Sequence, residues 1–397
     1  MERNMKTNLT LISLCLLFPI LCHATTWDEP WMEVVIKDAD AFVKADVTEN
    51  RPDGFKATLL KHLAGENVSK EFKVTGFSLL HFSSYSAKED VFRFNPDLDY
   101  YLFLKKGKKE GQYLIATPTT GWAIIISEGV NATYRHSYHQ ALVPEDVYEE
   151  SMSAIFKKLH NEKVKSDTII AYIEKHLSKE PALPSKSDGN EDVLKKFFLQ
   201  HVALELFRYF GTAEKIDLID PYLSTDDYHV QISAVRAIGR INTNDSKRRL
   251  IEFIESDRVG FAKVMAVWGL ERLNAVEYKG HLNAFLKNGK DEETGFGNSI
   301  MDPRVGTHFP RSVKAAVEDL LIKWKNESSN KAIELVPRDA EAYRQRGVAY
   351  AQGKGQYDRA ISDFNKAIEL DPKLAMAYNN RGLAYALGKG QYDRAIS

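Results

Sequence analysis

The chain has 397 residues, and its 54 basic and 55 acidic side chains give a formal net charge of -1. This balance gives no bulk electrostatic reason to expect nucleic acid or an anionic membrane as a partner. The length predicts two or three domains, and the 44% hydrophobic content is ordinary for a soluble globular protein.

Residues 1–24 have the pattern of a secretory signal peptide. Arg3 and Lys6 precede an apolar run, Leu9–Leu21, and the run is followed by Cys22-His23-Ala24. The basic start, the short apolar run and the small residues before a cleavage point predict cleavage after Ala24. We therefore expect an exported protein, periplasmic or extracellular. The alternative is an uncleaved N-terminal anchor, although the run is short for a membrane span.

Both cysteines of the chain, Cys15 and Cys22, lie inside this predicted signal peptide. The mature protein would then have no disulfide, no thiol nucleophile and no cysteine metal ligand. For an exported protein this favours a bacterial source.

Residues 25–142 are predicted to form a small β domain, a barrel or a sandwich, because residues 28–142 contain short alternating or aromatic segments separated by turn residues. The expected strands are Ala41–Val47, Phe55–Leu60, Phe72–Val74, Tyr100–Leu104, Gly111–Ala116 and Trp122–Ser127. The order of these signals, with a Leu-x-Gly turn at Leu63–Gly65, resembles the OB-like or netrin-type modules of exported proteins. A generic β-sandwich is the alternative.

Residues 143–190 are predicted to be a helical connector followed by a linker. Pro144 is a helix-start signal before the amphipathic segments Val147–Leu159 and Thr168–Leu177. The polar, proline-containing stretch Ser178–Asn190 is expected to be a loop.

Residues 191–326 contain a degenerate helical repeat. Ala234–Asn242 aligns with Ala266–Asn274, Ala203–Gly211 fits one period upstream, and Ala315–Trp324 is a further copy. Second helices are expected at Ile216–Leu223, Arg249–Ile254 and Gly280–Leu286. The Ala-Val face resembles HEAT-like repeats, which implies an α-solenoid whose helix pairs share one core. The long Gly-containing segment Lys287–Pro310 interrupts it, either as a tolerated insertion or as a loop on the binding face.

Residues 327–397 contain a second, clearer repeat, in which Lys331–Leu335 recurs as Lys366–Leu370. The large, small and helix-ending residues of one unit are Tyr343, Gly347, Tyr350, Ala360, Phe364, Ala367 and Pro372. This pattern resembles the tetratricopeptide repeat (TPR), a helix–turn–helix unit of about 34 residues. The unit here is one residue longer, and the extra residue falls in Gly353–Gly355, between the two expected helices. The last copy ends at Ser397 before its second helix is complete, so we expect further repeats to follow.

The resemblance to these helical repeats implies a scaffold or adaptor that binds a protein or peptide, without catalysis and without a cofactor. In the TPR family the positions just after the first aromatic of each first helix face a groove. This implies a peptide-binding groove of Arg344, Gln345, Val348, Asn379, Asn380 and Leu383, in which Arg and Asn side chains could bind a backbone or a carboxylate.

Two alternative functions remain open at this stage. In one, the β domain binds a ligand or acts as an inhibitor, and the repeats are a spacer. In the other, the protein is a metal-dependent hydrolase of the cell envelope, with His136 and His139 as candidate metal ligands near Glu145 and Asp146. No nucleophile elbow or zinc-protease motif accompanies these histidines. The partner and the oligomeric state are not encoded in any motif.

Overall fold

The structure is a computed structural model. It describes residues 31–51, 54–75, 94–115, 121–135, 140–184, 190–294, 309–335, 337–352, 356–388 and 391. Tertiary contacts divide these residues into two compact units. The first holds the described residues up to Tyr172 together with Ala182–Leu206, and the second holds Ile173–Pro181 and the described residues from Phe207 onward. The predicted signal peptide lies outside the described residues, and the predicted domain boundaries stay predictions.

The first unit contains a closed five-stranded β-barrel. Its strands are β1 (Ala41–Arg51), β2 (Gly54–Gly65), β3 (Glu71–Thr75), β4 (Asp99–Lys106) and β5 (Gln112–Leu114). They pair in the order β1-β2-β3-β5-β4, and β4 pairs with β1 to close the ring. All pairs are antiparallel except β3 with β5. Of the two predicted β architectures, the barrel is the one that forms.

Three further strands and one helix accompany the barrel. Strand β6 (Trp122–Ile126) pairs with β4 and is followed by β7 (Gly129–Thr133) and β8 (Gln140–Val143). The sequence pattern predicted β6 but neither β7 nor β8. The interpretation of residues 28–142 as β throughout was wrong, because Met32–Asp38 forms helix α2. The helix follows from the spacing of its buried Met32, Val35 and Ile36, which places them on one helical face.

Strands β1 and β4 bury both of their faces over part of their length. Alternate residues of β1, beginning with Ala41 and Val43, point into the barrel core, which aromatic residues such as Phe55 and Phe94 fill. On the outer face Phe42 is also fully buried, and its ring stacks on Phe103 at 4.4 Å. Helix α3 (Glu145–Leu159) adds Tyr148 to this outer cluster, with its ring 6.1 Å from that of Phe42.

The predicted Leu-x-Gly turn is where β2 ends. Gly65 has a φ of +81°, a backbone conformation that residues with a Cβ rarely adopt. A Cβ at Gly65 would also lie 2.3 Å from the carbonyl oxygen of Asp40. Glycine is therefore required here so that the chain can leave the barrel close to the start of β1.

The helices that follow alternate as the repeat pattern predicted, and α3 begins directly after Pro144. The segments predicted as first helices overlap α5 (Glu191–Phe210), α7 (Tyr228–Ile238), α9 (Gly260–Arg272) and α11 (Val313–Leu335), and the first three run past the helix ends. Between them lie the short helices η2 (Ala213–Ile219) and α6 (Asp220–Leu223), then α8 (Asn244–Glu255), then η3 (Val276–Tyr278) and α10 (Lys279–Asn288). Helix α4 (Ser166–Leu177) precedes α5 and matches a predicted segment.

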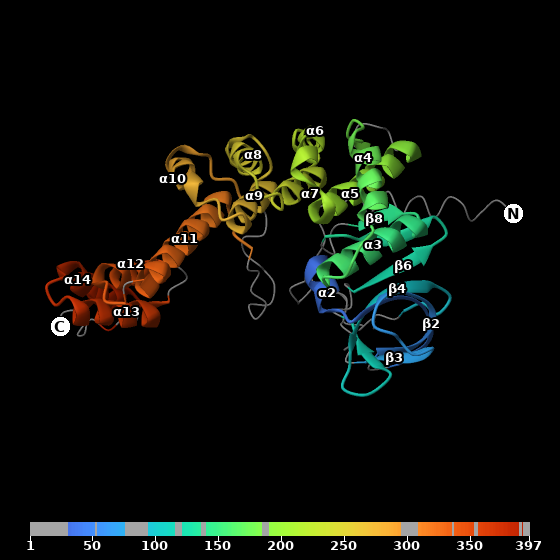
Figure 1. The fold of residues 1–397 in the computed structure, drawn as a ribbon, viewed down its shortest axis with the longest axis horizontal. Coiled ribbons are helices and arrows are strands. Elements are labelled where there is room, and N and C mark those ends of the chain that lie inside the picture. Colours follow the sequence, from blue (N-terminus) through green and yellow to red (C-terminus); the bar gives the residue numbers. More distant parts are fainter. Residues whose placement is uncertain are drawn as a thin grey trace, which may run out of the picture. The chain divides into compact units, whose positions relative to one another are not determined.

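The last helices form the TPR-like region of the second unit. Helix α12 (Ala340–Gln352) packs on α13 (Tyr357–Leu370), and α13 packs on α14 (Ala375–Leu383), which continues into η4 (Ala384–Gly388) (Figure 1). Helix α11 packs on α9 and α10 at one end of the region and on α12 at the other. One uninterrupted helix thus crosses residues 326 and 327, where the sequence patterns separated two repeat systems.

Candidate protein-binding surface

The TPR pattern residues make the contact between α12 and α13. A Cβ at Gly347 of α12 would lie 2.6 Å from the ring of Phe364 and 3.1 Å from the carbonyl oxygen of Ala360. The two helices therefore approach closely only because position 347 has no side chain. Ala360, Ile361, Phe364 and Ala384 form the buried cluster, with Val348, Tyr350, Ala351, Tyr357 and Tyr385 packed against it.

A partly buried ion pair joins the same two helices. The Arg346 guanidinium donates two hydrogen bonds of 2.7 Å to the carboxylate of Asp363, whose side chain is 8% exposed. The third nitrogen of Arg346 donates to Asn330 Oδ1 of α11 at 2.9 Å. One repeat later, Arg381 donates to Asn365 Oδ1 at 3.0 Å. Sequence reasoning missed this repeated Arg–Asn contact, although both partners recur at the spacing of the repeat and so contained the signal.

Two of the predicted groove residues of α12, Arg344 and Gln345, bind the same carboxylate, that of Glu341. Arg344 donates to Glu341 through Nε at 2.8 Å, and Gln345 donates to the same carboxylate at 3.0 Å. The hydrogen bond from Arg344 lowers the pKa of Glu341 to about 2, so this carboxylate is ionised. Val348 packs against the buried cluster. The structure thus brings Arg344 and Gln345 together at Glu341 and places Val348 partly in the core.

Helix α14 presents apolar side chains beside the predicted Asn residues. Asn379 is exposed, and Leu383 is 50% exposed. Sequence reasoning missed Met376, which is 58% exposed, and Leu387, which is 77% exposed. Met376 and Leu383 are two helical turns apart and therefore share one face of α14, and Leu387 follows about one turn later. We call Met376, Leu383 and Leu387 the α14 apolar row.

Asn380, the last of the predicted groove residues, is only partly exposed. Its Nδ2 atom is buried and donates no hydrogen bond among the residues that the structure describes. A buried amide without a partner is destabilising unless a ligand or water completes it. The six predicted residues therefore lie in different surroundings. Two bind Glu341, Val348 packs against the buried cluster, and three lie on α14.

The upstream helices carry a buried polar side chain at one repeated position. Gln200, Gln231 and Lys263 follow one another at the spacing of the predicted repeats. Gln200 accepts a hydrogen bond from the Ala182 amide at 2.7 Å, and Gln231 donates to the Thr225 carbonyl at 2.7 Å. Each of these two contacts fixes a loop to a helix, so the position is used for structure.

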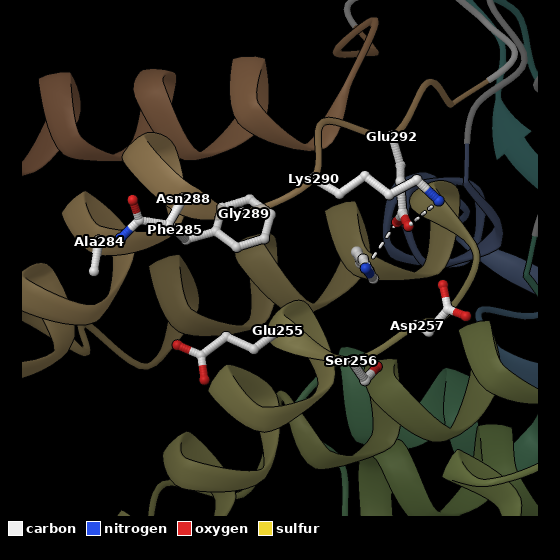
Figure 2. A pocket seen from close by; sticks show the side chains of 10 residues that line it. Glu255, Ser256, Asp257, Ala284, Phe285, Asn288, Gly289, Lys290 and Glu292 are labelled. Carbon is white, nitrogen blue, oxygen red and sulfur yellow. Dashed lines mark ion pairs between the residues drawn. The ribbon is translucent and has the colours of Figure 1, made fainter.

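Lys263 lies at a pocket of about 400 Å³ lined by residues of α8, α9 and α10 and by residues 289–292 (Figure 2). Its Nζ atom lies 2.7 Å from Glu292, and both side chains are largely buried, with 3% and 13% exposure. Lys290, which is largely exposed, lies 3.6 Å from the other carboxylate oxygen of Glu292. The buried Lys263–Glu292 pair therefore fixes the segment after α10 to helix α9.

The candidate metal ligands His136 and His139 lie outside the described residues. Within the described ranges, no group of three or more metal-ligating side chains gathers. In the same ranges, no helix is both long and apolar enough to cross a membrane.

Comparison with known proteins places a repeat family at the C-terminal end. The family model described as "TPR repeat" matches residues 354–388, which include α13 and α14. No curated protein sequence matches. Eight chains of solved structures match. One is the crystal structure of MamA protein, at 19% identity over 58% of this chain and 87% of that chain, with a TM-score of 0.18. A superposition at that score supports no structural argument, so the TPR assignment rests on the family model and on the α12–α14 packing.

Proposed function

We propose that this protein is an exported scaffold that binds a protein or peptide partner through the surfaces of its helical repeats, with no catalytic role. The observation that carries the proposal is the α14 apolar row, because it lies within the segment that matches the TPR family. Helical repeats stack into extended surfaces that are suited to binding a peptide. Exposed apolar side chains that cluster on one helix face are typical of interaction sites.

The finer architecture belongs to the same proposal. We infer that the barrel is OB-like, which its five closed strands and Greek-key-type order support. We also infer that residues 191–326 form HEAT-like repeats, which the alternation of helices α5 to α11 and the repeated position of Gln231 and Lys263 support. Neither inference adds a catalytic group.

Binding through α14 is tested by replacing Met376 and Leu383 with serine together. Peptides are first selected from a random display library on the full chain, and their affinities are then measured by fluorescence anisotropy. Each buried Leu or Met side chain contributes about 1.5 kcal/mol or more, so the double variant is expected to bind at least about tenfold more weakly.

The matched control for this test is Leu60→Ser, which changes a side chain of similar exposure, 47%, on strand β2. It should leave the affinity unchanged, and circular dichroism should show that both variants stay folded. If the library yields no binding peptide, or if the α14 variant binds as well as the unaltered chain, the proposed function is wrong.

Export is tested by the position of the mature N-terminus. The chain is expressed in a bacterium with an outer membrane, and the periplasmic fraction and the medium are analysed by N-terminal sequencing. We expect a product that begins at Thr25, because cleavage is predicted after Ala24. Leu16→Arg, which places a charge in the apolar run, should keep the chain in the cytoplasm. A full-length product in the cytoplasm of the unaltered strain would rule out export.

A further inference from the structure

The pocket at Lys263 lies where two helices end. Its lining includes Glu255, the last residue of α8, and Asn288, the last residue of α10 (Figure 2). The C-terminal end of a helix carries the negative end of its dipole, and its last carbonyl groups have no partner within the helix. Both helix ends therefore favour a positively charged group in the pocket.

The charged side chains of the lining add to this preference. The carboxylates of Glu255, Asp257 and Glu292 and the ammonium groups of Lys263 and Lys290 line the pocket, which leaves one negative charge in excess. Both lysines lie near the same carboxylate, because Lys263 Nζ is 2.7 Å from Glu292 Oε2 and Lys290 Nζ is 3.6 Å from Glu292 Oε1. The excess negative charge therefore belongs to the other two acidic residues.

Glu255 and Asp257 are the carboxylates that remain for a ligand. Asp257 is exposed and forms no ion pair with any part of the chain that the structure describes. Glu255 lies 3.5 Å from Nδ1 of His281, and both of these side chains are about half exposed, at 47% and 59%. Ion pairs between exposed groups contribute little. A basic group that enters the pocket therefore meets two carboxylates that are free to bind it.

The pocket also has an apolar wall, formed by the ring of Phe285, which is 6% exposed. Its volume of about 400 Å³ lies in the range of about 300–1,000 Å³ that is typical of ligand sites. The side chains of lysine and arginine carry an apolar stem before the charged group. One such side chain can pack its stem on Phe285 while its charge reaches the carboxylates, whereas a bare metal ion would leave the apolar wall unused.

We propose that this pocket binds a basic side chain, lysine or arginine, of the peptide partner, with Glu255 and Asp257 as the carboxylates that receive its charge. This rests on the proposed function and names the chemistry of a second contact with the same partner. The Lys263–Glu292 pair supports the site, because it holds in place the segment that forms one wall of the pocket. We call the pocket lined by Glu255, Asp257 and Phe285 the acidic pocket.

The test compares two synthetic peptides on the full chain by fluorescence anisotropy. In one short capped peptide leucine alternates with lysine and arginine, and the other has acetyl-lysine and citrulline at the basic positions, which removes the charge. We expect the basic peptide to bind at least about tenfold more tightly, because hydrogen bonds between charged groups are stronger than those of neutral groups. The double variant Glu255→Gln with Asp257→Asn should abolish this preference.

The matched control is the double variant Glu318→Gln with Asp319→Asn. It removes the same two kinds of carboxylate from exposed positions of α11 outside the pocket lining. It should change the preference less than about twofold, because surface charges away from the contact are largely screened at about 0.15 M salt. The melting temperature of the pocket variant should be unchanged or raised, since Glu255 places a negative charge at a helix C-terminus.

Three outcomes would overturn the acidic pocket. The first is a basic peptide that fails to bind or binds no more tightly than the neutral one. If the serine variant of the α14 apolar row weakens an equal binding of both peptides, the proposed function still stands and the acidic pocket alone is rejected. The second is an unchanged preference in the pocket variant. The third is displacement of the basic peptide by calcium chloride, compared with sodium chloride at equal ionic strength, which would identify a metal site.

Discussion

Replacing Arg346 with methionine is expected to destabilise the α12–α13 pair by about 3 kcal/mol, because it leaves the buried carboxylate of Asp363 without its cation. Asp363 would lose both of its 2.7 Å hydrogen bonds while its side chain remains 8% exposed. Asn330 would lose its partner on α12 as well. The readout is hydrogen exchange of the amides of α12 and α13, which reports local opening in a chain of more than one unit.

Two variants make this result specific. Arg359→Ala removes an exposed arginine of α13 that donates to Gln356 and lies 5.8 Å from the ring of Tyr350. It should lower the free energy of local opening by no more than about 1 kcal/mol. The double variant R346M/D363L replaces the pair by apolar side chains and should recover most of the lost protection. If R346M exchanges no faster than the Arg359 variant, the pair does not hold the helices together.

Replacing Lys263 with methionine is expected to destabilise α9 and the segment after α10 by a similar amount, about 3 kcal/mol. The largely buried Glu292 would then have only the exposed Lys290, 3.6 Å away, as an ion-pair partner among the described residues (Figure 2). Increased exchange in α9 and in residues 289–294 would show the effect.

The control for this second prediction lies in the same pocket. Lys290→Met changes a lysine whose side chain is 76% exposed, and surface ion pairs contribute about 0–1 kcal/mol. Its exchange should stay close to that of the unaltered protein. If both variants lost protection from hydrogen exchange to a similar extent, the burial of Lys263 would not be what stabilises the segment.

Sequence patterns predicted the parts of this fold that repeat or alternate. The helices α7 and α9 follow from the aligned repeats and α12 from the TPR pattern, whereas β1 follows from alternation and β4 from its run of aromatic and apolar residues. The pattern failed at α2, which is too short to distinguish a helix from a strand by periodicity alone. It also failed at β7 and β8, which are short, and β7 contains Gly129 and Asn131.

The candidate site was less predictable than the fold, because its main contacts depend on tertiary packing. Arg344 and Gln345 were expected to face a ligand, but Glu341, one helical turn before them, engages both. The Arg346–Asp363 pair joins two different helices, which no single-helix pattern contains. Met376 and Leu387 could be recognised as candidate contact residues only from the structure, which leaves both side chains more than half exposed.

The continuous helix α11 fixes the rotation about its axis between the contacts at its N-terminal part and those at its C-terminal part. Val313, Val317, Leu320 and Trp324 are buried on its N-terminal part, and Asn330 meets Arg346 on its C-terminal part. Each residue of an α-helix advances about 100° around the axis and about 1.5 Å along it. A single inserted residue between Trp324 and Asn330 would therefore turn one set of contacts away from its partners while leaving the other in place. The number of residues in this helix therefore decides, as much as the identity of its side chains, whether the contacts at both of its ends can form together.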